Sequence, residues 1–273
     1  MAKRVESPSS INTFQQCKRK YYYQYIEKLP TFPSIHTVRG NIAHSCLEDF
    51  YEINTTSFTK EDADFKFRAA MQKLLLHHWV QYKPKLVELN LNKDQERFYF
   101  EETMLMLMNW TNQFLDILKK EIAKGKTLQE AFYYLTPIRE QEYRSESNSV
   151  RGFVDAIHHY GDQVHIVDYK TNANSEVKDS IMLQLGIYSL LYKEKHGTPP
   201  HKVGIYFLRD RLKLMPVNEE LMNKALQTIE GIHAHTSITE SKIDYPKTIT
   251  PLCKWSSGQC DFYGVCKPHD RDF

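Results

Sequence analysis

No stretch of this 273-residue sequence approaches the roughly 18 uninterrupted apolar residues that a transmembrane helix requires. The residues that follow Met1 to Arg4 likewise lack the apolar core of a secretory signal. Lysine and arginine number 36 against 34 for aspartate and glutamate, and the net charge of +2 is too small for charge alone to hold the chain on nucleic acid. We therefore expect a soluble, intracellular protein without membrane contact, in which any binding of a polyanion is local.

Internal repeats, low-complexity tracts and glycine/serine linkers are also missing, although KLPTFPS (28–34) indicates an early loop. With 41% hydrophobic and 12% aromatic residues, the chain can bury a substantial core. We expect one continuous domain over residues 1–273.

Cysteine is scarce and unevenly placed. The five cysteines are an odd number, and four of them lie near the two chain ends, unlike the spread of a small secreted disulfide framework. Ligation of a metal ion or of a metal cluster is therefore the alternative to disulfide bonding. The fifth, Cys46, lies in a segment of helical pattern, and we expect it to be buried packing.

Apolar spacing predicts a mainly helical region over about 40–125, followed by a mixed region over about 137–235. Helices are expected at 40–52, at 60–82 with Thr59 as N-cap, and at 93–124 with Gly125 closing the helix. In the mixed region, strands are expected at 138–145, 149–160 and 163–171, with Gly161 and Asp162 in a hairpin turn. A helix ending at Gly197, a second hairpin over 202–217 and a last helix over 218–235 complete the pattern. The predicted fold class is α/β.

The third predicted strand ends in IVDYKTN (166–172), which brings Asp168 and Lys170 close together. If this strand pairs with its predecessor, Asp155 and Asp168 converge at one sheet edge, with Lys170 on the same face as Asp168. Carboxylates so close repel each other unless a hard cation such as Mg²⁺ or Mn²⁺ lies between them. Such an ion can polarise a phosphodiester and acidify its bound water, while a nearby lysine can orient or deprotonate that water. Taken alone, the tripeptide DYK has a simpler alternative, an exposed ion pair at a strand end.

Four motifs together carry more information than this tripeptide. In chain order they are RGNIAH (39–44), GFVD (152–155), DYK (168–170) and QLGIY (184–188). In type and order they resemble the RecB-like nucleases of the PD-(D/E)xK superfamily, over nearly the whole chain. The resemblance implies a metal-dependent DNA exonuclease. It also implies a restriction-endonuclease-like fold, in which helices flank a mixed sheet and an N-terminal helical region precedes the catalytic core.

The resemblance assigns roles to individual residues. It places Asp155, Asp168 and Lys170 in the active site, with His44 as a further ligand of the Mg²⁺ or Mn²⁺ that both aspartates hold. It implies that Gln184 and Tyr188 help to hold the DNA strand near the scissile phosphate, and their spacing of four places them on one helix face. Without the motifs, His44 would be an ordinary interior histidine and Tyr188 a core residue.

The cysteines near the chain ends are Cys17, Cys253, Cys260 and Cys266. Four thiolates suit either a structural Zn²⁺ or a [4Fe-4S] cluster, and spacing alone does not separate them. An iron–sulfur subset of the family has one cysteine in an N-terminal S-x-S-x₄-F-x₂-C segment and three near the C-terminus. This subset includes the AddB nuclease domain, the CRISPR-adaptation RecB-like exonucleases and exonuclease V. The resemblance thus implies a [4Fe-4S] cluster joining segments 7–26 and 250–270, although C-x₆-C replaces the commoner C-x₂-C. Four unligated cysteines are the alternative.

Lys18, Arg19 and Lys20 lie next to four tyrosines, a mixture able to contact phosphate and stack on bases, or else a solvated face over a tyrosine-rich core. LRDRLK (208–213) is a second segment that could contact phosphate.

The sequence shows no base-reading module and no helicase P-loop. We therefore expect recognition of single-stranded DNA or DNA ends, in the cytoplasm or on the nucleoid if prokaryotic. Unwinding would come from a helicase or from another repair or adaptation partner. A structure-selective endonuclease and a non-catalytic DNA-end-binding subunit are the rival interpretations.

Overall fold

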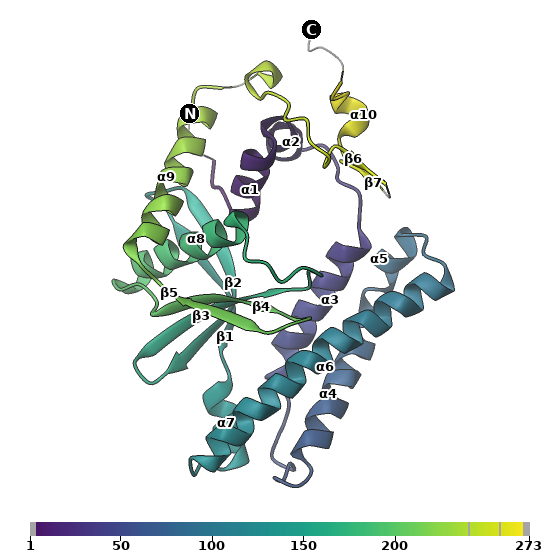
Figure 1. The fold of residues 1–273 in the computed structure, drawn as a ribbon, viewed down its shortest axis with the longest axis vertical. Coiled ribbons are helices and arrows are strands. Elements are labelled where there is room, and N and C mark those ends of the chain that lie inside the picture. The colour runs from purple at the N-terminus through teal and green to yellow at the C-terminus, as the bar shows by residue number, and fades with distance from the viewer. Residues whose placement is uncertain (1–3, 240, 257, 270–273) are drawn as a thin grey trace.

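The computed structural model describes residues 4–239, 241–256 and 258–269, and a five-stranded sheet forms its centre (Figure 1). The strands lie in chain order, from β1 at one edge to β5 at the other. β3 and β4 run parallel, and the other neighbouring pairs are antiparallel. The strands are β1 (Ile138–Ser145), β2 (Val150–Tyr160), β3 (Gln163–Lys170), β4 (Lys202–Phe207) and β5 (Leu212–Pro216).

Helices cover both faces of this sheet and create two apolar cores. One core contains Val167 and Tyr169 of β3, and the other contains Ile166 of the same strand, because successive side chains of a strand point to opposite faces. The first core is closed by α3 (Ile35–Phe50), α4 (Ala63–Gln81), α5 (Lys83–Glu88), α6 (Lys93–Ala123) and α7 (Leu128–Leu135). The second is closed by α1 (Pro8–Gln16), α2 (Lys18–Tyr21), α8 (Asp179–His196) and α9 (Glu219–Thr236).

The segment of α1 and α2 lies beside the segment that follows α9, above one end of the sheet in Figure 1. The backbone N–H of Arg19 donates to the carbonyl of Pro246 at 3.2 Å, and the ring of Tyr21 stacks on that of Tyr245. The remaining short elements all belong to this region. They are the π-helix η1 (Tyr22–Ile26), the 3₁₀ turn η2 (Lys242–Asp244), β6 (Lys254–Trp255), β7 (Gly258–Gln259) and α10 (Tyr263–Cys266).

The chain crosses over from β3 through α8 to β4, and this connection places α8 beside the polar end of β3. Because both faces are covered, β3 is buried from His165 to Tyr169. Its polar end contacts both flanking helices, through His44 of α3 at the Tyr169 carbonyl and Gln184 of α8 at Lys170. The residues of IVDYKTN therefore leave the core at the end of β3, between α3 and α8.

The predicted α/β fold is confirmed, with a mixed sheet flanked by helices. The turn at Gly161 (φ +63°) joins β2 to β3 as expected, and Gly125 and Gly197 follow α6 and α8 in positive φ. The domain boundaries within 1–273 remain a prediction. None of the helices in the described ranges is long and apolar enough to cross a bilayer.

Two predicted helix starts are wrong. The helix predicted at 40–52 is α3, which begins at Ile35 rather than at residue 40. Ser34 is its N-cap, because the Ser34 side chain accepts the N–H of Thr37. The next begins at Ala63, and Thr59 is not its N-cap; instead the Asp62 side chain accepts the N–H of Thr59 and stabilises a turn before the helix. The short helices α5 and α7 were not predicted.

Candidate functional site

Three carboxylates form a row across the first three strands of the sheet. In the β1–β2 ladder, Glu140 and Asp155 lie between the pairs Arg139↔Ala156 and Gln141↔Val154, and in the β2–β3 ladder Asp155 and Asp168 lie next to the pair Ala156↔Val167. Residues directly opposite each other share a face, and like charges in such pairs repel. A row of this kind is stable only if cations or hydrogen-bond donors lie against it.

His44 of α3 contributes one such cation. Its Nδ1 lies 3.5 Å from Asp155 Oδ1, and its Nε2 lies 3.1 Å from the carbonyl oxygen of Tyr169. Burial alone would lower the pKa of His44, but its hydrogen bond with Asp155 and the charges of Asp155 and Asp168 raise that pKa to about 9. The imidazole thus faces acceptors through both ring nitrogens.

Lys170 neutralises the buried carboxylate of β3. Its Nζ lies 2.7 Å from Asp168 Oδ2, and only 2% of Asp168 is exposed. Burial raises the pKa of Asp168 to about 6, although the Lys170 ammonium acts in the opposite direction. Burial also acts to lower the pKa of Lys170, but the charge of Asp168 outweighs it, so the pKa of Lys170 is raised and the amine stays protonated at neutral pH.

Gln184 of α8 connects the members of this ion pair. Its Nε2 donates to Asp168 Oδ1 at 2.6 Å and to the Tyr188 hydroxyl at 2.8 Å, while its Oε1 accepts from Lys170 Nζ at 3.1 Å. Tyr188 is only 4% exposed, and its ring lies against Gly152 of β2. A Cβ at that glycine would come within 2.9 Å of the Tyr188 ring, so the small residue of GFVD lets the tyrosine reach the site.

Glu140 is a residue that sequence reasoning missed. It has φ +46°, a left-handed conformation that is rare for glutamate and that clusters at functional sites. Glu140 is exposed to solvent, yet desolvation by the surrounding protein and the nearby charge of Asp155 raise its pKa to about 7. No motif marks Glu140 in the sequence. Its place beside Asp155 depends on how β1 pairs with β2, which the sequence alone does not give.

The donor set fits a divalent cation. His44, Glu140 and Asp155 each offer a ligand atom, and these atoms all lie within 4.8 Å of one another. One imidazole and clustered carboxylates are ligands that suit Mn²⁺ and, through the oxygens, Mg²⁺. The predicted set was His44, Asp155 and Asp168; in the structure Glu140 completes the close group, while the Asp168 oxygens contact Lys170 and Gln184.

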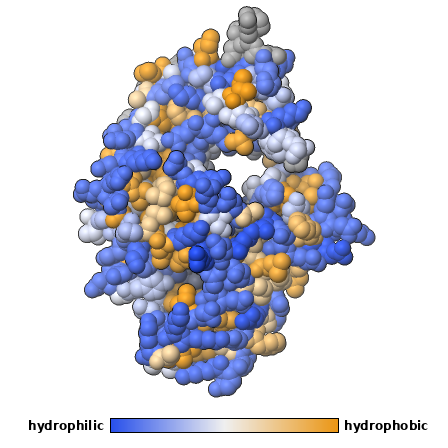
Figure 2. Space-filling view, in the orientation of Figure 1, coloured by the Kyte–Doolittle hydropathy of each residue, from blue (hydrophilic) through white to orange (hydrophobic). Residues whose placement is uncertain are grey.

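A groove opens from Lys170 and Gln184 toward the N-terminal ends of α1 and α8. Its lining includes Arg151 and Phe153 on β2 and Lys178 just before α8, and half of Phe153 is exposed. The space-filling view shows an opening between the part that carries the chain ends and helices α3 to α6 (Figure 2). The groove thus begins at Lys170 and Gln184, two residues that contact Asp168, and its wall offers cations and an aromatic ring.

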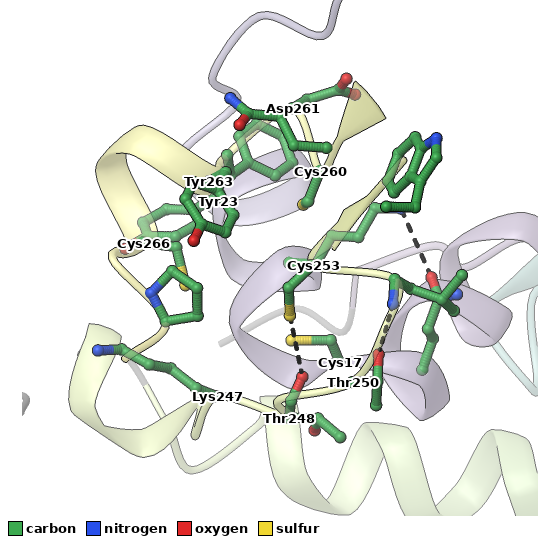
Figure 3. Close-up of a pocket in the computed structure, with 17 residues that line it drawn as sticks. Cys17, Tyr23, Lys247, Thr248, Thr250, Cys253, Cys260, Asp261, Tyr263 and Cys266 are labelled. Atoms are coloured by element: carbon green, nitrogen blue, oxygen red, sulfur yellow. Dashed lines mark hydrogen bonds between the residues drawn. The ribbon is translucent and has the colours of Figure 1, made fainter. Parts of the chain in front are cut away.

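The four terminal-region cysteines meet in a second place. Cys17, Cys253, Cys260 and Cys266 line one pocket of about 190 Å³, and Figure 3 shows their side chains turned into it. Burial raises the pKa of the Cys260 and Cys266 thiols, and the proximity of Cys17 adds to this effect.

The spacing of these cysteines is wider than a zinc site requires. Among the residues that the structure describes, no three of their sulfurs lie within 4.8 Å of one another. A tetrahedral Zn²⁺ with bonds of about 2.3 Å holds its sulfurs roughly 3.8 Å apart. The described sulfurs therefore do not already form the tight tetrahedron of a bound zinc ion.

The predicted DNA contact at Arg19 is wrong, whereas those at Lys18 and Lys20 remain predictions. Arg19 is 1% exposed and its Nε donates to the carbonyl of Tyr245 at 2.8 Å, so it is an interior residue that joins the chain ends. Tyr21 and Tyr23 are buried as well and cannot stack on bases. Lys18 and Lys20 are partly exposed, and Lys20 lines the cysteine pocket rather than the carboxylate site.

Comparison with known proteins gives a matching family model and a number of similar solved structures. A family model described as the PD-(D/E)XK nuclease superfamily matches residues 6–267. A crystal structure of a protein from Eubacterium rectale, provisionally described as an exonuclease, superposes with a TM-score of 0.54 at 12% identity, covering 100% of this chain and 91% of that one. At this identity the second match establishes likeness of fold alone. No curated protein matches the sequence.

Proposed function

The chain belongs to the PD-(D/E)XK nuclease superfamily, and from this premise we propose that it is a divalent-metal-dependent deoxyribonuclease, an exonuclease acting on single-stranded DNA or DNA ends. The observation that carries the proposal is the meeting of His44, Glu140, Asp155 and the Asp168–Lys170 pair at one sheet edge. This edge joins carboxylates, an imidazole and an ammonium beside an open groove.

Each residue has a distinct task in this proposal. Asp155, His44 and Glu140 would hold Mg²⁺ or Mn²⁺, with Asp168 completing the site. When bound, the cation polarises the phosphodiester and acidifies the attacking water. Lys170 is protonated, so it acts by orienting the water and offsetting negative charge on the phosphate rather than as a base. Gln184 keeps Asp168 and Lys170 in position through its three hydrogen bonds.

The groove favours a single strand as substrate. Arg151 and Lys178 are cations suited to backbone phosphates, and Phe153 is an exposed aromatic ring on which a base can stack. Stacking and phosphate contacts are indifferent to sequence. A strand with a free end would lie in this groove with its end at Lys170.

For the cysteine pocket we propose a [4Fe-4S] cluster, with Zn²⁺ as the alternative occupant. Its four ligands would be Cys17, Cys253, Cys260 and Cys266, which line one pocket, and the resemblance to the iron–sulfur subset favours the cluster over Zn²⁺. Because it would join the two chain ends, removing it should lower stability before it affects chemistry. Protein purified without oxygen should be brown and contain iron; colourless protein that contains zinc would refute the cluster.

Cellular context follows from the same features. The reaction suits repair, recombination or CRISPR adaptation in the cytoplasm. The sequence contains no P-loop, so we propose that a partner helicase or adaptation protein supplies the strand.

The decisive experiment compares Lys170→Ala with Lys202→Ala on labelled single-stranded DNA in Mg²⁺ or Mn²⁺. Lys202 lies at the opposite end of the neighbouring strand β4 and serves as the matched control. We expect Lys170→Ala to lose cleavage by at least about 10²-fold and the control to retain it. Equal cleavage by both variants would exclude the proposed chemistry. Cutting of covalently closed single-stranded circles would favour an endonuclease, and binding without cleavage would favour an end-binding subunit.

A further inference from the structure

Two arginines from distant parts of the chain share one carboxylate beside the candidate active site. Arg209, just after β4, contacts both carboxylate oxygens of Glu102, with its Nη1 3.1 Å from Oε1 and its Nη2 hydrogen-bonded to Oε2. Arg39 of α3 donates to the same Oε2 from its Nη1 at 3.3 Å. Burial, with the charge of Arg209, lowers the pKa of Arg39. Two guanidinium groups against one carboxylate leave one positive charge in excess.

These arginines retain hydrogen-bonding capacity. Arg39 is only 4% exposed, and the Nε atoms of Arg39 and Arg209 are buried without a hydrogen-bond partner among the described residues. A guanidinium has five N–H donors and no acceptor, so only an anion or a neutral oxygen can satisfy the remaining ones. Buried donors of this kind normally have partners.

The cluster is placed next to the chemistry. The backbone N–H of Leu208 donates to the Lys170 carbonyl at 2.9 Å, so Arg209 follows directly from the end of the strand beside Lys170. Arg39 precedes His44 by five residues on α3, about 7.5 Å along the helix axis. Gly40, between them, faces Thr171, the residue after Lys170.

The turn that carries Arg209 is held in place by α6. Asn109 Nδ2 donates to the carbonyls of Leu208 and Asp210, each at 2.9 Å, and Gln113 Nε2 donates to the carbonyl of Asp210 at 2.8 Å. Glu102 lies on the same helix and aligns the guanidinium itself. The positive charge is therefore preorganised rather than carried on a free side chain.

We propose that Arg209, aligned by Glu102 and backed by the buried Arg39, binds a backbone phosphodiester of the substrate strand adjacent to the one that is cut. The single excess positive charge matches the single negative charge of a diester. This inference rests on the proposed nuclease function and extends it, because it names the groups that set the position of the strand over Lys170. The LRDRLK segment is thereby given a specific role, through Arg209.

The test compares Arg209→Ala with Arg211→Ala, an exposed arginine on the same turn. Both are made in protein carrying Lys170→Ala so that DNA is not cut, and binding of fluorescent oligothymidylate is measured by anisotropy at several salt concentrations. We expect about tenfold weaker binding for Arg209→Ala and a salt dependence shallower by about 0.7 in the log–log slope, the value for one phosphate on single strands. Arg211→Ala should bind as the parent does. Equal binding by the two variants overturns the proposal.

A second measurement changes the DNA one position at a time, so its effect on the parent protein does not depend on the folding of a variant. A neutral methylphosphonate replaces one phosphate at a time in the oligonucleotide. At one position next to the cleavage site, this replacement should weaken binding of the DNA to the parent protein but not to Arg209→Ala. If no position behaves in this way, the proposal is wrong. If instead only a terminal phosphate is sensitive to Arg209→Ala, the site takes a monoester and the diester assignment fails. Absence of cleavage by the unmodified chain would refute the nuclease function itself, which is a separate outcome.

Discussion

Replacing Gln184 by glutamate is expected to reduce the rate of cleavage far more than it changes substrate binding. In the structure the Gln184 amide donates to Asp168 Oδ1 at 2.6 Å and accepts from Lys170 at 3.1 Å. The substitution replaces a donor by a carboxylate, so an attraction to Asp168 becomes a repulsion. The pKa of Asp168, which burial already raises to about 6, should rise further.

The size of the effect follows from these contacts. A hydrogen bond to a charged group contributes about 1.5–3 kcal/mol, and a repulsion of similar size adds to its loss. A sum of about 3–6 kcal/mol corresponds to a decrease in kcat of roughly 10²–10⁴-fold. Gln184→Met, which removes the bonds without adding charge, should cost about tenfold to a hundredfold.

The assay measures kcat and KM on labelled single-stranded DNA, with thermal unfolding as a check on the fold. Gln227→Glu, at an exposed position on α9, adds the same charge away from the site and serves as the control. The resemblance to RecB-like nucleases implies that Gln184 contacts the DNA, in which case KM should rise while kcat is kept. A Gln184→Met protein with unchanged kcat would falsify the positioning role.

Three further predictions concern other parts of the sheet. Gly152→Ala places a Cβ 2.9 Å from the Tyr188 ring, so we expect a loss of about 1–3 kcal/mol in urea unfolding together with slower cleavage; unchanged stability would show that the ring moves freely. Glu140→Gln should weaken binding of Mn²⁺ about tenfold in calorimetry, and unchanged affinity would remove Glu140 from the ligand set. Burial lowers the pKa of His158 to about 4, so below pH of about 6.5 the unfolded state takes up a proton that the folded state does not. The free energy of unfolding should therefore fall by at most about 1.4 kcal/mol per pH unit between pH 6.5 and 4, and this contribution should be missing in His158→Phe; identical pH profiles for both proteins would contradict it.

Local patterns predicted most of the secondary structure, because helix and strand periods and turn residues act over a few neighbours. The turn at Gly161 and the ends of α6 and α8 follow from glycine at positions of positive φ. The helix starts at Ile35 and Ala63 were misplaced because capping depends on which nearby side chain reaches a free N–H, and several candidates compete.

Longer-range features escaped prediction for a different reason. Nothing in the local sequence marks Arg19 as more buried than Lys18 and Lys20. It is buried because the C-terminal segment folds over it and offers the Tyr245 carbonyl. Glu140 carries no motif, and its importance arises from the register of β1 against β2.

The sequence by itself determined the chemistry of the candidate site: two aspartates, a lysine, a histidine and a glutamine in a recognisable order, and four cysteines near the chain ends. The tertiary structure alone decided which groups meet. It placed Glu140 beside Asp155, and it joined Glu102 to Arg39 and Arg209 across 63 and 107 residues of chain. Such contacts depend on strand register and helix packing, which are properties of the whole folded chain and leave no mark in any local stretch of residues.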